Sequence, residues 1–94
     1  LVRRQNSDVA NRLASLLISL AYETLRTTEG WNKPCEIPLS IPQEQLASMV
    51  GSTQPTVSAT LQQFRNAGLI VGAGRRIVLL NPIEMIYRLD HNLL

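Results

Sequence analysis

The sequence predicts a single, mainly α-helical domain with one small β-hairpin, an α+β fold, and three stretches of the chain support this. Apolar residues recur at helical spacing near the start of the chain, and two short helical patterns joined by Gly51 follow within residues 41–68. Two β-prone runs then flank the glycine-rich segment 72–74. With 94 residues, the chain is long enough for one domain with one modest core.

Composition and charge narrow the class of protein. Hydrophobic residues make up 45% and charged residues 17% of the chain, which is typical of a globular rather than a disordered protein. The net charge of +2 permits a nucleic-acid partner without requiring one. The single cysteine, Cys35, excludes an intramolecular disulfide and a multi-cysteine metal site, and favours a reducing, cytoplasmic location. No apolar run approaches the ~20 residues that span a membrane, so no membrane partner is predicted.

The first predicted element is an amphipathic helix from Asp8 to about Arg26. Ser7 is a suitable N-cap, and Asp8 lies in the first turn, where the helix dipole favours an acid. Residues 27–34 contain glycine, asparagine and proline and are expected to form a loop. The inward face of the helix is defined by Val9, Leu13, Leu16, Leu17 and Leu20.

A short strand and the first of two paired helices are predicted next. Residues 35–40 can pair as a strand, and Pro42 fits the first turn of the following helix, where its missing N–H costs nothing. Gly51 supplies the left-handed conformation that ends this helix. The residues expected to face inward are Leu46, Ala47 and Val50, and Ala47 is small where the two helices must cross.

The second helix of the pair is expected to begin after Ser52 and Thr53, which are both good caps, with Pro55 in its first turn. It should run to about Ala67 and stop at Gly68. Its inward residues, at helical spacing, are Val57, Leu61 and Phe64. Two helices joined by such a tight turn form a helix-turn-helix, a unit whose second helix fits the DNA major groove.

A hairpin follows the helix pair directly. Residues 69–71, with inward Leu69 and Ile70, and residues 75–80 are β-prone and enclose the tip 72–74. A helix-turn-helix followed by a hairpin is a winged helix-turn-helix. Asn81-Pro82 ends the hairpin, and residues 83–89 predict a short final helix that packs Met85 or Ile86 onto the domain.

In the order and spacing of these fragments, the chain resembles the C-terminal DNA-binding domain of the Crp/Fnr family of bacterial transcription regulators over nearly its whole length. Residues 8–17, with Asp8-Val9 and Arg12-Leu13-Ala14, resemble the helix that opens the family's domain. Residues 46–51 resemble the first helix-turn-helix element, and residues 56–61 the recognition helix. Residues 67–70 and 75–77 resemble the turn into the wing.

The resemblance implies a homodimer on a two-fold DNA site, with an N-terminal domain that senses a small molecule or a redox state. No cofactor is expected within this domain, and RNA polymerase is a further candidate partner. Residues 1–7 would be the end of a dimerisation helix or the hinge after it, and residues 8–94 the winged helix domain. Because the first residue is Leu1 rather than Met, we expect the chain to be part of a longer protein.

The candidate DNA-binding residues lie at the start of the recognition helix and on the wing. The family usually carries arginine at the positions of Gln54 and Ala59, and often glutamate at Pro55. An arginine bidentate to guanine supplies about 1–3 kcal/mol of discrimination, whereas Gln54 can bond adenine and Ala59 can touch a thymine methyl. We therefore expect a preference for A·T-rich half-sites. The candidate residues are Ser52, Thr53, Gln54, Thr56, Ser58, Ala59, Gln62, Arg75 and Arg76.

These residues also have readings that do not involve DNA. Thr53 is expected to act as a cap, a role compatible with DNA contact. Arg75 and Arg76 either contact phosphates or form a charged edge strand that discourages aggregation. Arg65 is expected to be exposed, and either reaches a phosphate or pairs with a neighbouring acid.

Other conspicuous residues are expected to be structural. Arg3 and Arg4 are read as a solvated terminus, although they are also able to steer DNA. Trp31 is expected to close one edge of the core, and Cys35 to be a small buried hydrophobic residue. A metal site is not expected around His91, the only histidine.

The sequence thus predicts sequence-specific DNA binding and transcription regulation rather than catalysis. Neither a nucleophile turn nor a glycine-rich phosphate loop before a helix is present, so no enzyme activity is expected. The alternative is a winged helix that binds another protein. This alternative arises because Glu44 and Arg65 are the only charged residues between Ser40 and Gly68, whereas a groove binder normally carries a basic stripe.

Overall fold

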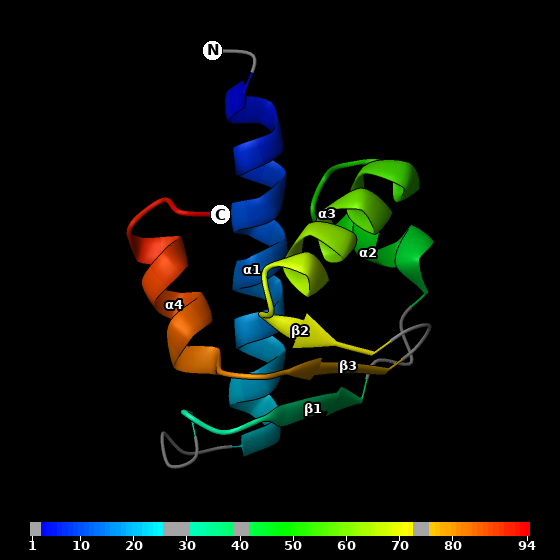
Figure 1. Cartoon of the computed structure of the whole chain (residues 1–94). Coiled ribbons are helices and arrows are strands. Elements are labelled where there is room, and N and C mark those ends of the chain that lie inside the picture. Colours follow the sequence, from blue (N-terminus) through cyan, green and yellow to red (C-terminus); the bar gives the residue numbers. More distant parts are fainter. Residues whose placement is uncertain (1–2, 26–30, 39–41, 73–75) are drawn as a thin grey trace.

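The computed structural model describes residues 3–25, 31–38, 42–72 and 76–94. Within these residues it contains four helices and a small antiparallel sheet of three strands, which confirms the predicted α+β winged helix-turn-helix. The long helix α1 runs through the middle of the domain, with α4 on one side and α2 and α3 on the other (Figure 1). The sheet lies across the lower end of α1 in this view. The elements are α1 (Arg3–Leu25), β1 (Cys35–Pro38), α2 (Gln43–Met49), α3 (Gln54–Asn66), β2 (Ile70–Val71), β3 (Arg76–Leu79) and α4 (Pro82–Asp90).

Helix α1 begins five residues earlier than the sequence predicts. It starts at Arg3 rather than Asp8, so Ser7 lies inside the helix and the prediction that it is the N-cap is wrong. Residues 3–7 contain neither proline nor glycine, and nothing in them breaks the helical hydrogen bonding. The predicted inward face is confirmed, with Leu16 and Leu20 partly buried and small alanines beside the larger residues. Its buried residues are Val9, Ala10, Leu13, Ala14, Leu17 and Ala21. No helix of the described residues is long and apolar enough to cross a membrane.

The turn between α2 and α3 has the predicted geometry. Gly51 adopts a φ of 68°, and the Ser52 amide donates to the Ala47 carbonyl at 2.8 Å, which closes the end of α2. Pro42, expected in the first turn, instead occupies the N-cap with an extended backbone, because α2 begins only at Gln43. The residues predicted to join the two helices to the core, Leu46, Ala47, Val50, Val57, Leu61 and Phe64, are all buried.

Helix α3 has the predicted caps at both ends. Thr53 is the N-cap, and its hydroxyl oxygen accepts a hydrogen bond from the Thr56 amide at 3.4 Å. Pro55 lies in the first turn. At the other end, Ala67 is the C-cap and Gly68 adopts a φ of 74°, as a glycine that ends a helix commonly does.

The sheet explains how the wing is joined to the domain. Its strand order is β1-β3-β2, so the hairpin strand β3 lies between β2 and the earlier strand β1. Ile37 pairs with Ile77, and Cys35 with Leu79, and all four are buried. Arg76 pairs with Pro38 of β1, and its strand β3 is the central strand of the sheet, so the reading of this residue as part of an edge strand is wrong. Arg75 lies outside the described residues.

Helix α4 closes the domain against α1. The Asn81 side chain caps it by accepting from the Glu84 amide at 3.2 Å, and Met85 is fully buried while Ile86 is only partly buried. Trp31 is buried as predicted, and its carbonyl accepts from the Ile83 amide at 3.0 Å. Cys35 is also buried as predicted, and this burial raises the pKa of its thiol.

Replacing Gly51 by alanine is expected to lower the free energy of unfolding by about 1–2 kcal/mol, because a Cβ disfavours the left-handed conformation. An added Cβ would meet no atom within 4 Å, so backbone strain rather than a clash is the cause. Gly51→Asn should lose less, since asparagine tolerates positive φ better. Urea unfolding followed by circular dichroism measures both changes, and equal stability of Gly51→Ala and the native chain would contradict this account of the turn.

Candidate nucleic-acid interface

Helix α3 presents an uncharged, solvent-exposed face. Pro55, Ala59, Gln62 and Asn66 are exposed and recur at the spacing of one helical face. The opposite face is formed by the buried residues Val57, Thr60, Leu61 and Phe64. The exposed face therefore offers amide groups and small apolar surfaces, without a formal charge, to a partner.

The start of α3 is ordered by its own hydroxyl groups. The Thr53 hydroxyl accepts from the Thr56 amide and donates to the Thr56 hydroxyl oxygen at 3.0 Å, so the capping role predicted for Thr53 is confirmed. Gln54 is exposed in the first turn, and Ser52 is half-buried in the turn before it. These groups surround the N-terminus of a 13-residue helix, where backbone N–H groups favour an anion such as a phosphate.

Ser58, predicted to contact DNA, connects the two helices of the motif. Its hydroxyl donates a hydrogen bond to Oε1 of Gln43 in the first turn of α2, and the Ser58 side chain is half-buried. The bond holds the first half of α3 against the start of α2. Gln43 carries no signal for this role in the sequence, because no periodic pattern relates a glutamine to a serine 15 residues later.

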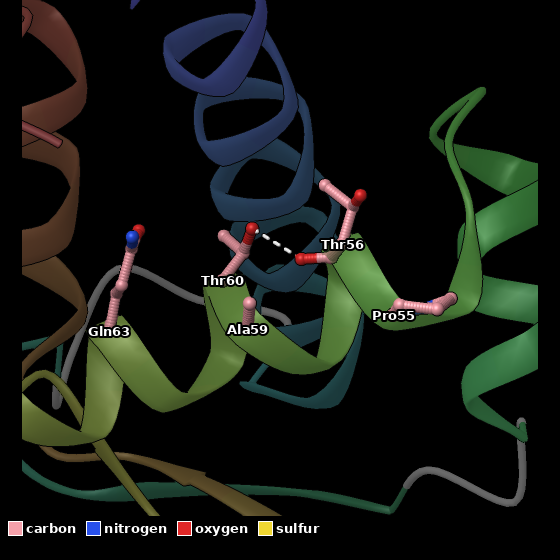
Figure 2. A pocket seen from close by; sticks show the side chains of 5 residues that line it. All are labelled: Pro55, Thr56, Ala59, Thr60 and Gln63. Carbon is pink, nitrogen blue, oxygen red and sulfur yellow. Dashed lines mark hydrogen bonds between the residues drawn. The ribbon is translucent and has the colours of Figure 1, made fainter.

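A shallow pocket of about 240 Å³ lies along α3. Figure 2 shows its lining side chains rising from successive turns of the helix, with the Thr60 hydroxyl turned back to donate to the Thr56 carbonyl at 2.8 Å. This bond satisfies the one polar group of the buried Thr60 side chain. The rest of the lining combines the carbon surfaces of Pro55 and Ala59 with the amide of Gln63. The pocket is lined by Pro55, Thr56, Ala59, Thr60 and Gln63.

Arg65 is held by oxygen atoms of the protein in this structure. Its Nε donates to the carbonyl oxygen of Gly72 at 2.8 Å, and its Nη1 donates to Oε1 of Gln62 at 3.3 Å. Within the described part of the chain its partners are therefore a carbonyl and an amide, and not the neighbouring acid that was one of the two expectations. Arg76 is the first residue of β3, and the structure does not describe its side chain.

No metal-binding cluster of three or more histidine, cysteine, aspartate or glutamate side chains occurs among the described residues. His91 follows α4 and stacks on Tyr87, with ring centroids 4.1 Å apart. Its Nδ1 lies 2.8 Å from the Tyr87 carbonyl oxygen. His91 is therefore the C-cap residue of α4.

Most of the domain matches a known protein family. A family model described as the Crp-like helix-turn-helix domain matches residues 11–85, which include all of α2, α3, β2 and β3. No curated protein sequence matches the chain significantly.

Solved structures of transcription regulators share the fold. The imidazole-bound CO-dependent transcription factor CooA from Carboxydothermus hydrogenoformans is 28% identical with a TM-score of 0.64, covering 90% of this chain and 36% of that one. FixK2 from Bradyrhizobium japonicum is 25% identical with a TM-score of 0.66, covering 84% and 37%. A CRP-family transcriptional regulator from Thermus thermophilus is 28% identical with a TM-score of 0.64, covering 90% and 40%. The chain thus spans between 36% and 40% of the length of these proteins.

Proposed function

The chain belongs to the family of Crp-like helix-turn-helix domains, and on this premise we propose that it is the DNA-binding output domain of an effector-responsive transcription regulator. The observation that carries the proposal is the exposed face of α3, presented beside the wing inside the matched region. In this function, the N-terminal half of α3 enters the major groove and the wing meets the flanking phosphates.

The roles of the individual residues follow from this placement. Gln54, Ala59 and Gln62 face base edges, whereas Ser52, Thr53 and Thr56 meet backbone phosphates near the helix N-terminus. The Ser58 hydroxyl donates to Gln43, and in this function it also contacts the DNA. Arg75 and Arg76 supply the wing's positive charge.

The assembly that we propose is a homodimer on a two-fold site, with half-sites about one helical turn apart. Residues 1–7 would lead from a dimerisation helix or hinge into the winged domain. The effector, a small molecule or a redox signal, would act on a part of the protein outside residues 8–94. RNA polymerase is a further proposed partner, and the cytoplasm, where bacterial DNA lies, is the proposed location.

A second candidate function, docking of another protein on α3, is favoured by one observation. The exposed face of α3 carries no formal charge, and Arg65 at its edge is bonded to Gly72 and Gln62. Salt separates the two candidates, because DNA binding weakens steeply as salt rises, whereas docking through polar and apolar groups changes little. Fluorescence anisotropy with random and selected duplexes at several salt concentrations is therefore the deciding experiment.

Replacing both wing arginines, Arg75→Ala together with Arg76→Ala, is expected to weaken binding to all duplexes alike. The slope of log affinity against log salt should become shallower by about 0.9 for each arginine that contacts a phosphate. The same anisotropy titrations measure this change. The matched control removes Arg3 and Arg4, which lie at the far end of α1 from the sheet in Figure 1, and should alter the slope less. An unchanged slope in the wing variant would rule out the wing contact.

A further inference from the structure

The guanidinium group of Arg65 joins the end of α3 to the start of the wing. Arg65 lies in the last turn of α3, and Gly72 is the residue that follows β2. The 2.8 Å bond from Nε to the Gly72 carbonyl therefore links two elements that are separated in the sequence by a helix end and a strand. Arg65 is half-buried in this arrangement.

Few strand pairings join the start of the wing, around Gly72, to the sheet. Strand β2 has two residues, and its pairing with β3 reaches outward only as far as Val71 with Val78. Gly72 comes next and has a φ of 110°, a conformation that residues with a side chain rarely adopt. Among the described residues, no ladder pair of β2 includes Gly72, and its carbonyl oxygen accepts a hydrogen bond from Arg65 of α3 instead.

The same guanidinium is held on the helix side by a chain of amides. Nη1 of Arg65 donates to Oε1 of Gln62, and Nε2 of Gln62 donates to Oδ1 of Asn66 at 3.0 Å. Gln62 and Asn66 belong to the exposed face of α3. Arg65 thus donates in two directions from one rigid plane, which a lysine ammonium on a flexible stem cannot reproduce from one position.

We infer that Arg65 is a positioning residue that sets the wing at a fixed place relative to α3, so that both elements meet one DNA duplex together. The inference rests on the proposed DNA-binding function. The guanidinium of Arg65 binds groups of the protein itself, Gly72 and Gln62, and it affects DNA binding by positioning the wing. A direct phosphate contact by Arg65 is the competing account, and it predicts different results for conservative variants.

Anisotropy with a selected duplex at several salt concentrations separates the two accounts. With Arg65 as a positioning residue, Arg65→Lys and Arg65→Gln should both weaken binding, by roughly three- to tenfold, and neither should have a further effect once Arg75 and Arg76 are alanine. Wild-type affinity in Arg65→Lys would overturn the inference, as would an equal loss in Arg65→Gln with and without the wing arginines. The matched control is Arg88→Lys, because Arg88 pairs with Glu84 at 2.8 Å on α4, on the other side of α1 from α3 (Figure 1).

A measurement without DNA distinguishes this inference from the function on which it rests. In Arg65→Gln, the amide hydrogens of residues 70–72 and 76–78 should exchange faster by about two- to tenfold, the factor that the loss of one net hydrogen bond represents, while those of α4 stay unchanged. Unchanged exchange at the wing would overturn the inference even if the chain binds DNA. Faster exchange at the wing in a chain that binds no duplex would instead reject the proposed function and leave the link between Arg65 and the wing in place.

Discussion

Leu61→Ala is expected to lower the free energy of unfolding by about 2–5 kcal/mol, the range for truncating a fully buried leucine. Leu61 is 1% exposed on the inward face of α3, and that helix contacts both α2 and α1. A cavity here would have helices on several sides, so the surroundings can collapse into it only partly. Because small domains are stable by only about 5–15 kcal/mol in total, this variant should melt at a temperature well below that of the native chain.

Met49→Ala is the matched control for that measurement. Met49 is a large apolar residue at the end of α2, but it is 51% exposed, so its truncation leaves no cavity. Its effect on the free energy of unfolding should stay within about 0.5 kcal/mol. Urea titration followed by circular dichroism gives both values, and similar losses in the two variants would mean that the helix-turn-helix does not pack around Leu61 as described.

The helices were predictable because their signals are local. The spacing of apolar residues identifies the inward faces of α1, α2 and α3, and Gly51 and Gly68 end two of those helices with the expected positive φ. The start of α1 was predicted wrongly. A good capping residue such as Ser7 does not mark the first turn of a helix when the residues before it are helical as well. Helix propensity and apolar periodicity depend on residues within one or two helical turns of each other. They therefore predict those features of the fold that neighbouring residues determine.

The sheet and the interface depend on contacts between distant residues, which periodicity does not contain. The strand around Cys35 was predicted, but its pairing with β3, at Leu79, joins residues 44 positions apart, and this pairing makes β3 a central strand. The bonds from Ser58 to Gln43 and from Arg65 to Gly72 likewise cross from one element to another. The sequence singled out Ser58 and Arg65 as polar residues of the motif, but only the folded arrangement assigns their partners, Gln43 and Gly72.

Ala59→Arg is expected to change which duplexes the chain prefers. Ala59 is exposed on the outer face of α3 and lines the shallow pocket with Pro55, so an arginine there would extend from the helix without displacing a buried group. An arginine that reaches O6 and N7 of guanine supplies about 1–3 kcal/mol of discrimination, or roughly 5- to 150-fold in relative affinity. The variant should therefore gain affinity for half-sites with a G·C pair facing position 59 over those with A·T.

The native chain should show the opposite preference, through the carbon surface of the same pocket. A thymine methyl placed against Ala59 would contribute an apolar contact, and replacing thymine by deoxyuridine removes only that methyl. The native chain should therefore bind the deoxyuridine duplex less tightly than the thymine duplex. Ala59→Arg should be less sensitive to this exchange, because its base contact no longer depends on the methyl.

Added charge alone would also raise affinity for DNA, and Asn66→Arg controls for it. Asn66 is exposed on the same face of α3 but at the end of the helix, whereas recognition helices read bases mainly with their N-terminal residues. Asn66→Arg should therefore raise affinity for all duplexes alike and steepen the salt dependence by about 0.9 if it meets a phosphate. Competition anisotropy with paired G·C and A·T duplexes measures the preference of each variant. If Ala59→Arg raised every affinity equally, as the control does, the outer face of α3 would not read bases, and docking of a protein on that face would become the better account.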